Sequence, residues 1–212
     1  MTFSIVARNP VDGSLGVATA TAGPAVGALV PHVIAGVGAV ATQAMTNPYL
    51  AHDCLARMPA MSAQSAMDAA LAQDREPQRR QLIVVDRNGS VACWTGSACD
   101  PFAGHLAGKG FAVAGNILTG PGVLQAMLEA YEADAPFEQR LLAALVAGER
   151  AGGDARGTGS AALKVFGQEA FASIDLRVDW SEAPLDGLAA LLERTTTGSY
   201  GVFFNAVPKR YS

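Results

Sequence analysis

Cysteine and histidine are too scarce and too dispersed in this sequence to predict a metal site or a disulfide framework. The 212 residues include three cysteines, and no two of them form a Cys-x-x-Cys pair. Structural zinc sites and disulfide frameworks both depend on closely spaced or paired cysteines. The three histidines lie far apart and lack the spacing of metal ligands. We therefore expect the protein to work without a metal or another cofactor.

Charge is also scarce, and no region concentrates one sign. Charged residues make up 16 % of the sequence, and the formal net charge is -4. The basic side chains are scattered, whereas a nucleic-acid-binding surface gathers them on one face. No apolar run reaches the ~20 residues of a membrane-spanning helix, and the start of the chain lacks a secretory signal. We therefore expect a cytoplasmic protein with a small-molecule substrate, and no nucleic-acid or membrane partner.

Hydrophobic residues are plentiful, at 50 %, and a chain of this length can bury a full core. Hairpin signals followed by pairs of helices favour antiparallel sheets with helices packed outside them. We expect strands over residues 3–8, 15–21, 25–33, 36–42, 81–86, 90–95, 109–115, 160–166 and 170–174. We expect helices over residues 48–58, 62–73, 122–133, 136–151 and 184–194. Residues 1–194 would form one domain, and the aromatic-rich tail 195–212 would dock on it or form the interface of a homodimer.

The start of the chain combines a strand with a candidate nucleophile. Met1 and Thr2 come directly before the alternating apolar residues of the first predicted strand. Methionine is normally removed before a small residue, which would leave Thr2 with a free α-amine beside its own hydroxyl. An α-amine with a pKa of about 7.7–8.0 can accept the hydroxyl proton near neutral pH. Thr2 is therefore a candidate nucleophile that carries its own base.

Three later stretches contain further candidates. Cys99 is followed by His105, and a neighbouring imidazole favours the reactive thiolate of a cysteine. Asn116 lies between a predicted strand and a helix, where its amide could donate to a developing oxyanion. Arg156 lies in a glycine-rich loop beside Asp154, and the two either pair with each other or bind a substrate. This last pair points to a small zwitterionic or carboxylated amide, or a ureido compound.

Several separated blocks of the sequence together resemble a known family. The blocks are MTFSIVARNP, LGVATAT, GVGAVATQAMTNP, WTGSACDPFAGH, AGNILTGP, AGGDARG with SAAL, and DLRVD. In order and spacing they resemble the domain-of-unknown-function 1028 family, a bacterial family of the N-terminal nucleophile (Ntn) hydrolase-like superfamily. The resemblance implies an α+β fold, a four-layer αββα sandwich of two antiparallel sheets. It also implies an amidohydrolase that cleaves a C–N bond of a small molecule, with Thr2 as the nucleophile.

The resemblance places the site residues in these blocks. Thr2 and Asn116 are the predicted catalytic residues. The predicted substrate-binding residues are Thr21, Gln43, Asn47, Cys99, His105, Asp154 and Arg156. Two alternatives are a non-catalytic binding or assembly protein with the same sandwich, and a cysteine hydrolase that uses Cys99. The first alternative draws on the absence of a basic residue from the segment after Ala20, where proteasome-type relatives place one near the nucleophile.

Overall fold

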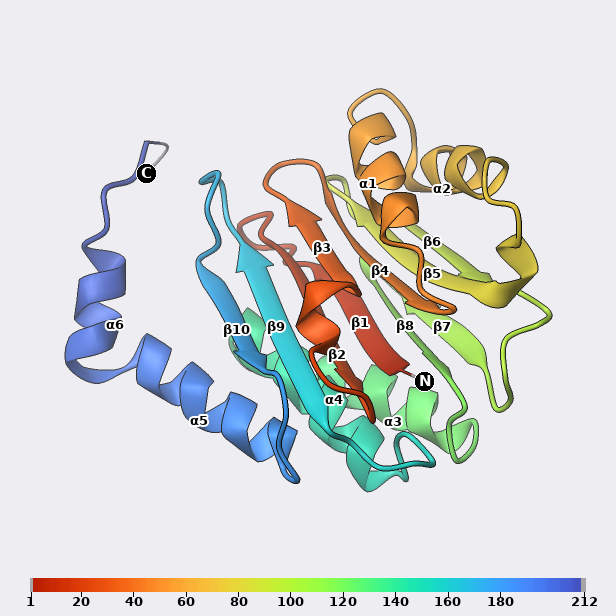
Figure 1. Ribbon diagram of the computed structural model, residues 1–212. Coiled ribbons are helices and arrows are strands. Elements are labelled where there is room, and N and C mark those ends of the chain that lie inside the picture. Colours follow the sequence, from red (N-terminus) through yellow and green to blue (C-terminus); the bar gives the residue numbers. More distant parts are fainter. Residues whose placement is uncertain (1, 211–212) are drawn as a thin grey trace.

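Two antiparallel sheets form the centre of the computed structural model, which describes residues 2–210 (Figure 1). The six-stranded sheet has the order β10-β9-β2-β1-β8-β7, and the four-stranded sheet has the order β3-β4-β5-β6. The strands of the larger sheet are β1 (Thr2–Arg8), β2 (Leu15–Thr21), β7 (Gly104–Gly108), β8 (Phe111–Asn116), β9 (Ser160–Phe166) and β10 (Ile174–Val178). Those of the smaller sheet are β3 (Pro31–Ile34), β4 (Gly38–Ala44), β5 (Arg80–Asp86) and β6 (Val91–Thr95).

Helices cover the outer face of each sheet. The helices are α1 (Pro48–Arg57), α2 (Ala63–Leu71), α3 (Gly122–Tyr131), α4 (Phe137–Arg150), α5 (Pro184–Thr196) and α6 (Gly198–Asn205). Apolar residues of α1 and α2 pack on β4, β5 and β6 in one core cluster. Those of α3, α4 and α5 pack on the six-stranded sheet in another. The result is the four-layer αββα sandwich that the sequence predicts, as Figure 1 shows.

The strand β1 illustrates why the chain forms layers. Its side chains alternate between two buried faces, because successive residues of a strand point to opposite sides. Phe3, Ile5 and Ala7 face the helices, whereas Val6 belongs to the apolar cluster between the two sheets. Every residue from Thr2 to Ala7 is buried. A strand that is apolar on both faces has to lie between two layers, and β1 does.

The layer between the sheets is apolar in its centre and polar at one edge, where β1, β5 and β9 begin and β2, β4 and β8 end. Its centre consists of small and branched apolar side chains from both sheets. At one edge, buried hydroxyl and amide side chains take over at the strand ends. They are Thr2 of β1, Thr21 of β2, Gln43 of β4, Gln81 of β5, Asn116 of β8 and Ser160 of β9. Buried polar groups need hydrogen-bond partners, and within residues 2–210 no buried side-chain nitrogen or oxygen lacks one.

The structure corrects two predicted strands and adds two elements. The strand predicted at 170–174 is wrong, because β10 begins at Ile174 and runs to Val178, where Leu176 and Val178 pack against the core. Residues 25–33 do not form one strand: the short 3-10 helix Val26–Ala28 precedes β3, and Ala25 has a left-handed φ of 55°. The sequence analysis also missed two elements, β7 and α6.

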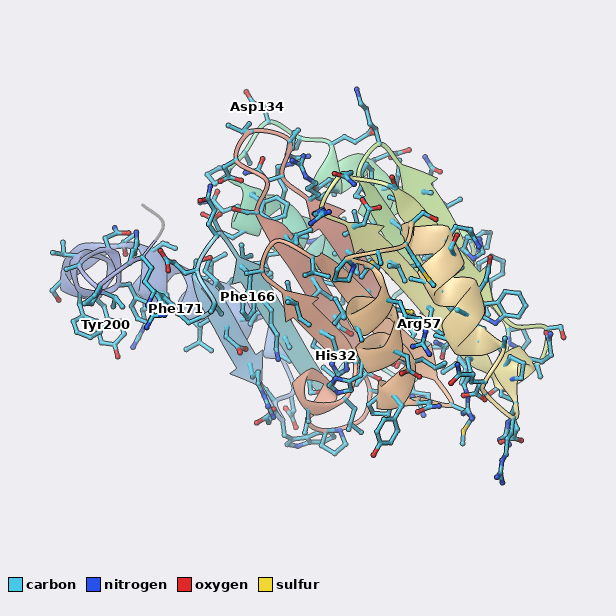
Figure 2. The ribbon with its side chains drawn as sticks, turned by 90° about the horizontal axis from the view of Figure 1, so that it is seen from above. His32, Arg57, Asp134, Phe166, Phe171 and Tyr200 are labelled. Carbon is cyan, nitrogen blue, oxygen red and sulfur yellow. The ribbon has the colours of Figure 1, made fainter. Side chains whose placement is uncertain are left out.

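The C-terminal helix α6 stands apart from the sandwich. Figure 2 shows Tyr200 of α6 far from the sheets, with Phe171 lying between them. The helix α5 continues to Thr196, beyond the predicted boundary at residue 194, and α6 follows after Thr197. No helix within residues 2–210 has the length and apolar character needed to cross a membrane.

Candidate functional site

A pocket of about 230 Å³ opens at the polar edge beside Thr2. Thr2, Thr21 and Thr46 contribute hydroxyl groups to its lining, and Arg156 contributes a guanidinium. The other lining residues are Gly23, Pro24, Ala25, Val26, Leu29, Val30 and Ala44. The pocket therefore combines a hydroxyl at the start of β1, an apolar wall from the segment after β2, and one cation.

Pairing of β1 with its two neighbours fixes the position of Thr2. Thr2 lies opposite Asn116 in the antiparallel pair of β1 and β8. On the other side, Thr2 Oγ1 donates a long hydrogen bond of 3.4 Å to Thr21 Oγ1 of β2. Because both neighbours are strands of the sheet centre, the Thr2 hydroxyl is held on a rigid element rather than on a loop. A nucleophile benefits from such positioning, since its geometry is set before substrate binds.

A chain of buried amides lies behind Thr2. Gln43 Nε2 donates to the Thr2 carbonyl oxygen (3.3 Å) and to Gln81 Oε1 (2.8 Å). Asn116 Nδ2 donates to the same Gln81 oxygen at 2.9 Å. Gln81 Nε2 in turn donates to the carbonyl oxygens of Gly104 and Gly115. Gln81 thus links the two sheets and fixes the orientation of both Gln43 and Asn116, although Asn116 itself does not line the pocket.

The loop between α4 and β9 brings Asp154 and Arg156 to the same edge. The Asp154 side chain is fully buried and accepts hydrogen bonds from the backbone N–H groups of Ala22 and Arg156, at 2.9 and 2.8 Å. Its carboxylate also forms an ion pair with Arg156 Nη2 at 3.6 Å. The Arg156 side chain remains 54 % exposed and lines the pocket. Asp154 therefore anchors both the loop after β2 and the loop that carries Arg156.

Strained backbone gathers around the pocket. Within residues 2–210, three non-glycine residues have a positive φ: Ala25 at 55°, Ala44 at 68° and Ile117 at 49°. Ala25 and Ala44 line the pocket, and Ile117 directly follows Asn116. A left-handed conformation costs a residue with a Cβ about 1–3 kcal/mol, and such residues cluster at functional sites. The strain is thus concentrated at the edge that carries Thr2.

Cys99 and His105 do not form a dyad. The Cys99 thiol donates to the Arg80 carbonyl oxygen at 3.4 Å, and His105 Nδ1 lies 2.8 Å from Thr95 Oγ1. Burial raises the pKa of the Cys99 thiol, an effect to which Asp100 adds, although a hydrogen bond from the Gly96 backbone opposes it. Partial burial lowers the pKa of His105. Through Thr95, which also accepts from Gln81 Nε2 at 3.0 Å, His105 connects to the amide chain rather than to Cys99.

Asn47 has a structural role in its immediate surroundings. It is the N-cap of α1, where its Oδ1 accepts from the Tyr49 N–H at 3.2 Å. Its Nδ2 donates to the carboxylate of Asp74 at 2.7 Å. Asn47 does not line the pocket, but the preceding Thr46 does. Of the residues predicted for the site, the structure therefore brings Thr2, Thr21, Gln43, Asn116, Asp154 and Arg156 to one edge of the sandwich.

Sequence reasoning missed Gln81 and Thr46. Gln81 is the first residue of a predicted strand, and only the pairing of β4 with β5 places it opposite Gln43. Thr46 lies in GVGAVATQAMTNP, one of the blocks that resemble the family, but it was not among the predicted site residues. Across residues 2–210, no three histidine, cysteine, aspartate or glutamate side chains gather as a metal site requires.

Comparison with known proteins identifies the family. Residues 2–188 match the family of unknown function DUF1028. The chain belongs to this family. The crystal structure of the DUF1028 protein SPO2555 from Silicibacter pomeroyi is 34 % identical, with a TM-score of 0.92 over 98 % of this chain and 91 % of that one. No curated protein matches the chain.

Two further solved structures match with lower identity and a lower TM-score. Anbu, the ancestral β-subunit, from Yersinia bercovieri is 11 % identical to this DUF1028 protein, with a TM-score of 0.47 over 99 % of this chain and 100 % of that one. Anbu from Hyphomicrobium sp. strain MC1 is 8 % identical, with a TM-score of 0.44 over the same shares. Both TM-scores are below 0.5, so neither structure supports an argument from similarity.

Proposed function

We propose that this DUF1028 protein is an N-terminal-nucleophile amidohydrolase that cleaves a C–N bond of a small amide or ureido compound. The observation that carries the proposal is the place of the Thr2 hydroxyl, at the first position of β1 and in the wall of a pocket. Thr2 would act after removal of Met1. The concentration of strained residues and buried amides at this edge supports the same location.

The proposed reaction proceeds through an ester of Thr2. Thr2 Oγ1 attacks the substrate carbonyl carbon, and the α-amine of Thr2 accepts the hydroxyl proton. The C–N bond breaks as the α-amine transfers this proton to the leaving nitrogen. Water, deprotonated by the same amine, then attacks the ester carbon and releases the acid together with the Thr2 hydroxyl. Every proton that moves in this scheme passes through one amine, so the pocket needs no second base.

The amide chain would keep this terminus in place. Gln43 holds the Thr2 carbonyl oxygen, and Thr21 holds the Thr2 hydroxyl from the neighbouring strand. Asn116 does not line the pocket but lies opposite Thr2 across the sheet, and one of its two N–H groups bonds Gln81, so we keep it as the predicted oxyanion donor through the other N–H. Gln81 is then a positioning residue, because it orients both Gln43 and Asn116 without reaching the pocket.

The test starts with the mass of the protein produced in cells with its native start. We expect Met1 to be absent and the chain to hydrolyse members of a panel of small amides. Thr2→Ala should lower turnover about 10³-fold or more, because it removes the nucleophile. Thr2→Ser should retain activity, and Thr195→Ala, a half-buried threonine of α5 outside the pocket, serves as the matched control.

Two results would contradict the proposal. Quantitative retention of Met1 in an otherwise folded protein would deprive Thr2 of its base and would favour a non-catalytic binding protein. Loss of activity in Cys99→Ala, with full activity in Thr2→Ala, would move the nucleophile to Cys99.

A further inference from the structure

We infer that the pocket beside Thr2 selects small amides that carry a single carboxylate, and that Arg156 binds this carboxylate. The inference rests on the proposed function, because it takes Thr2 as the point where the scissile carbonyl binds. The charge, the volume and the apolar lining of the pocket indicate the chemical class of the substrate.

The charge of the pocket selects an anion over a cation. Among the described residues that line it, Arg156 is the one with an ionisable side chain. Asp154, the nearest acidic partner of Arg156, has a side chain with 0 % exposure, and its carboxylate accepts the Ala22 and Arg156 N–H groups. A substrate ammonium therefore cannot reach Asp154, which removes the zwitterionic alternative. The Arg156 side chain is 54 % exposed and lines the pocket, so a substrate carboxylate can reach it.

The ion pair between Arg156 and Asp154 favours a ligand with a single negative charge. A guanidinium has five N–H donors in a planar fork, and the Arg156 side chain is 54 % exposed, so it can bind a carboxylate in addition to its ion pair with Asp154. Asp154 also restrains the side chain, which lowers the entropy lost when a ligand binds. A phosphate dianion would need a second cation to balance its charge, and the described lining residues supply one, Arg156. A monoanionic carboxylate is the better match.

The volume and the apolar lining of the pocket limit the size and polarity of the rest of the substrate. A volume of about 230 Å³ lies below the usual range of ligand pockets, ~300–1,000 Å³, so the pocket suits a small molecule. Pro24, Val26, Leu29 and Val30 make part of the wall apolar. A short hydrocarbon segment between the amide and the carboxylate would lie along this wall. Succinamate and N-acetylglycinate both have about the right size.

The first experiment compares each acid with its neutral isostere. Hydrolysis of succinamate is measured against succinamide, and that of N-acetylglycinate against N-acetylglycinamide, by release of ammonia or glycine. We expect kcat/KM to favour the acids about tenfold to a hundredfold, as a charged hydrogen-bonded pair would give. Arg156→Gln should remove this preference mainly through KM, and Arg156→Lys should retain part of it. Arg79→Gln is the control, since Arg79 forms an exposed ion pair with Glu76 at 3.0 Å.

The second experiment measures binding without catalysis, in the Thr2→Ala variant. Saturation-transfer NMR should detect binding of succinamate and weaker binding of succinamide, and this difference should disappear in a Thr2→Ala, Arg156→Gln double variant. Equal binding or equal hydrolysis of acid and neutral amide overturns the inference and leaves the proposed function intact. Selective binding of the acid by a wild-type protein that hydrolyses none of these amides refutes the proposed function and supports the ligand class. Absence of binding to both overturns the inference.

Discussion

Thr2 and Cys99 are both candidate nucleophiles, and they differ in how readily each can lose a proton. The base proposed for Thr2 is part of the same residue. The Cys99 thiol donates to the Arg80 carbonyl oxygen, and His105 Nδ1 contacts Thr95 rather than the thiol. Burial raises the pKa of Cys99, so the thiol stays protonated near neutral pH. At the scale of the residue, the surroundings therefore favour the hydroxyl that has its own amine over the more nucleophilic sulfur.

This difference predicts slow alkylation of Cys99. The reactive species is the thiolate, and a raised pKa lowers its fraction at every pH below that pKa. We expect iodoacetamide to modify Cys99 at pH 7.5 severalfold more slowly than it modifies a free cysteine peptide, with a rate that rises with pH. Peptide mass mapping locates the label. Rapid labelling of Cys99 at pH 7.5, together with loss of activity, would contradict the assignment of Thr2.

Single residues also mark the limit of prediction from sequence. Thr2, Asp154 and Arg156 could be found because a terminal hydroxyl and an Asp-x-Arg loop have recognisable chemistry. Gln81 could not, because its partners Gln43 and Asn116 come from strands distant in the sequence. The left-handed alanines have no sequence signature at all, since only the course of the folded backbone puts Ala25 and Ala44 in that conformation.

At the scale of elements, β5 joins the two sheets through one side chain. Gln81, at the start of β5, bonds Gln43 of β4 in its own sheet and Asn116 of β8 in the other. Its amide nitrogen reaches Gly104 of β7 and Gly115 of β8. Loss of this side chain would leave several buried polar groups in both sheets without partners.

Replacement of Gln81 by leucine should therefore destabilise the fold. Each buried group left without a hydrogen bond costs about 1–3 kcal/mol, so we expect the free energy of unfolding to fall by about 2–4 kcal/mol. Urea denaturation measures the change. Gln125→Leu is the control, because Gln125 bonds Glu129 on the exposed surface of α3 and its loss should cost less than about 0.5 kcal/mol. Equal effects of the two changes would mean that the amide chain does not hold the sheets together.

A second junction, at Asp74, joins α1, the end of α2 and β5. Its carboxylate accepts from Asn47 Nδ2 at the start of α1 and from Arg80 Nε at the start of β5. Burial raises the pKa of Asp74, but the hydrogen bonds from Arg80 and Asn47 outweigh it, so the net effect is a pKa below the usual 3.8. The carboxylate therefore contributes stability above its ordinary pKa, and this contribution is lost as pH falls through the lowered value.

The pH dependence of unfolding should reveal this contribution. We expect Asp74→Asn to be less stable than the parent at pH 6, and the difference to shrink as the pH falls below about 4. Chemical denaturation at a series of pH values gives the comparison. Asp134→Asn, in the exposed turn between α3 and α4, should leave stability unchanged within about 0.5 kcal/mol. A difference for Asp74→Asn that stays constant down to pH 2 would rule out the proposed hydrogen-bonded carboxylate.

The elements themselves could mostly be predicted, and the errors have local causes. The order of strands and helix pairs follows from hairpin signals and from helix starts such as Asn47-Pro48, which the cap of α1 confirms. The strand β7 was missed because it is short and has glycine at both ends. The strand β10 was placed too early, because Phe171 looks like a core residue in the sequence but is 44 % exposed in the structure.

At the scale of the whole molecule, α6 is the least integrated part of the fold. Tyr200, Val202 and Phe203 are 60 %, 69 % and 60 % exposed, and Figure 2 shows Tyr200 away from the sandwich. The rings of Tyr200, Phe203 and Phe204 contact one another within the helix. Exposed clusters of this kind are typical of interaction surfaces. We therefore propose that the protein forms a homodimer through residues 195–212.

Sedimentation velocity tests this proposal directly. We expect a dimer at micromolar concentration, and a monomer for the Tyr200→Asp, Phe203→Asp double variant, because two charges would be buried in the interface. Val11→Asp is the control, since Val11 is 90 % exposed in the turn between β1 and β2. A wild-type protein that sediments as a monomer at all concentrations would refute the homodimer.

The two ends of the described chain lie in different surroundings. Thr2 borders the pocket, whereas the other end follows α6 and bonds the loop between β9 and β10, where the Arg210 N–H donates to Glu169 Oε1 at 2.8 Å. For a laboratory that screens substrates, this asymmetry decides where an affinity tag belongs. A tag before Thr2 would convert the proposed amine base into a peptide bond and would obstruct the pocket. An inactive tagged preparation would then be an artefact of cloning, so the protein should be purified through its other end or without a tag.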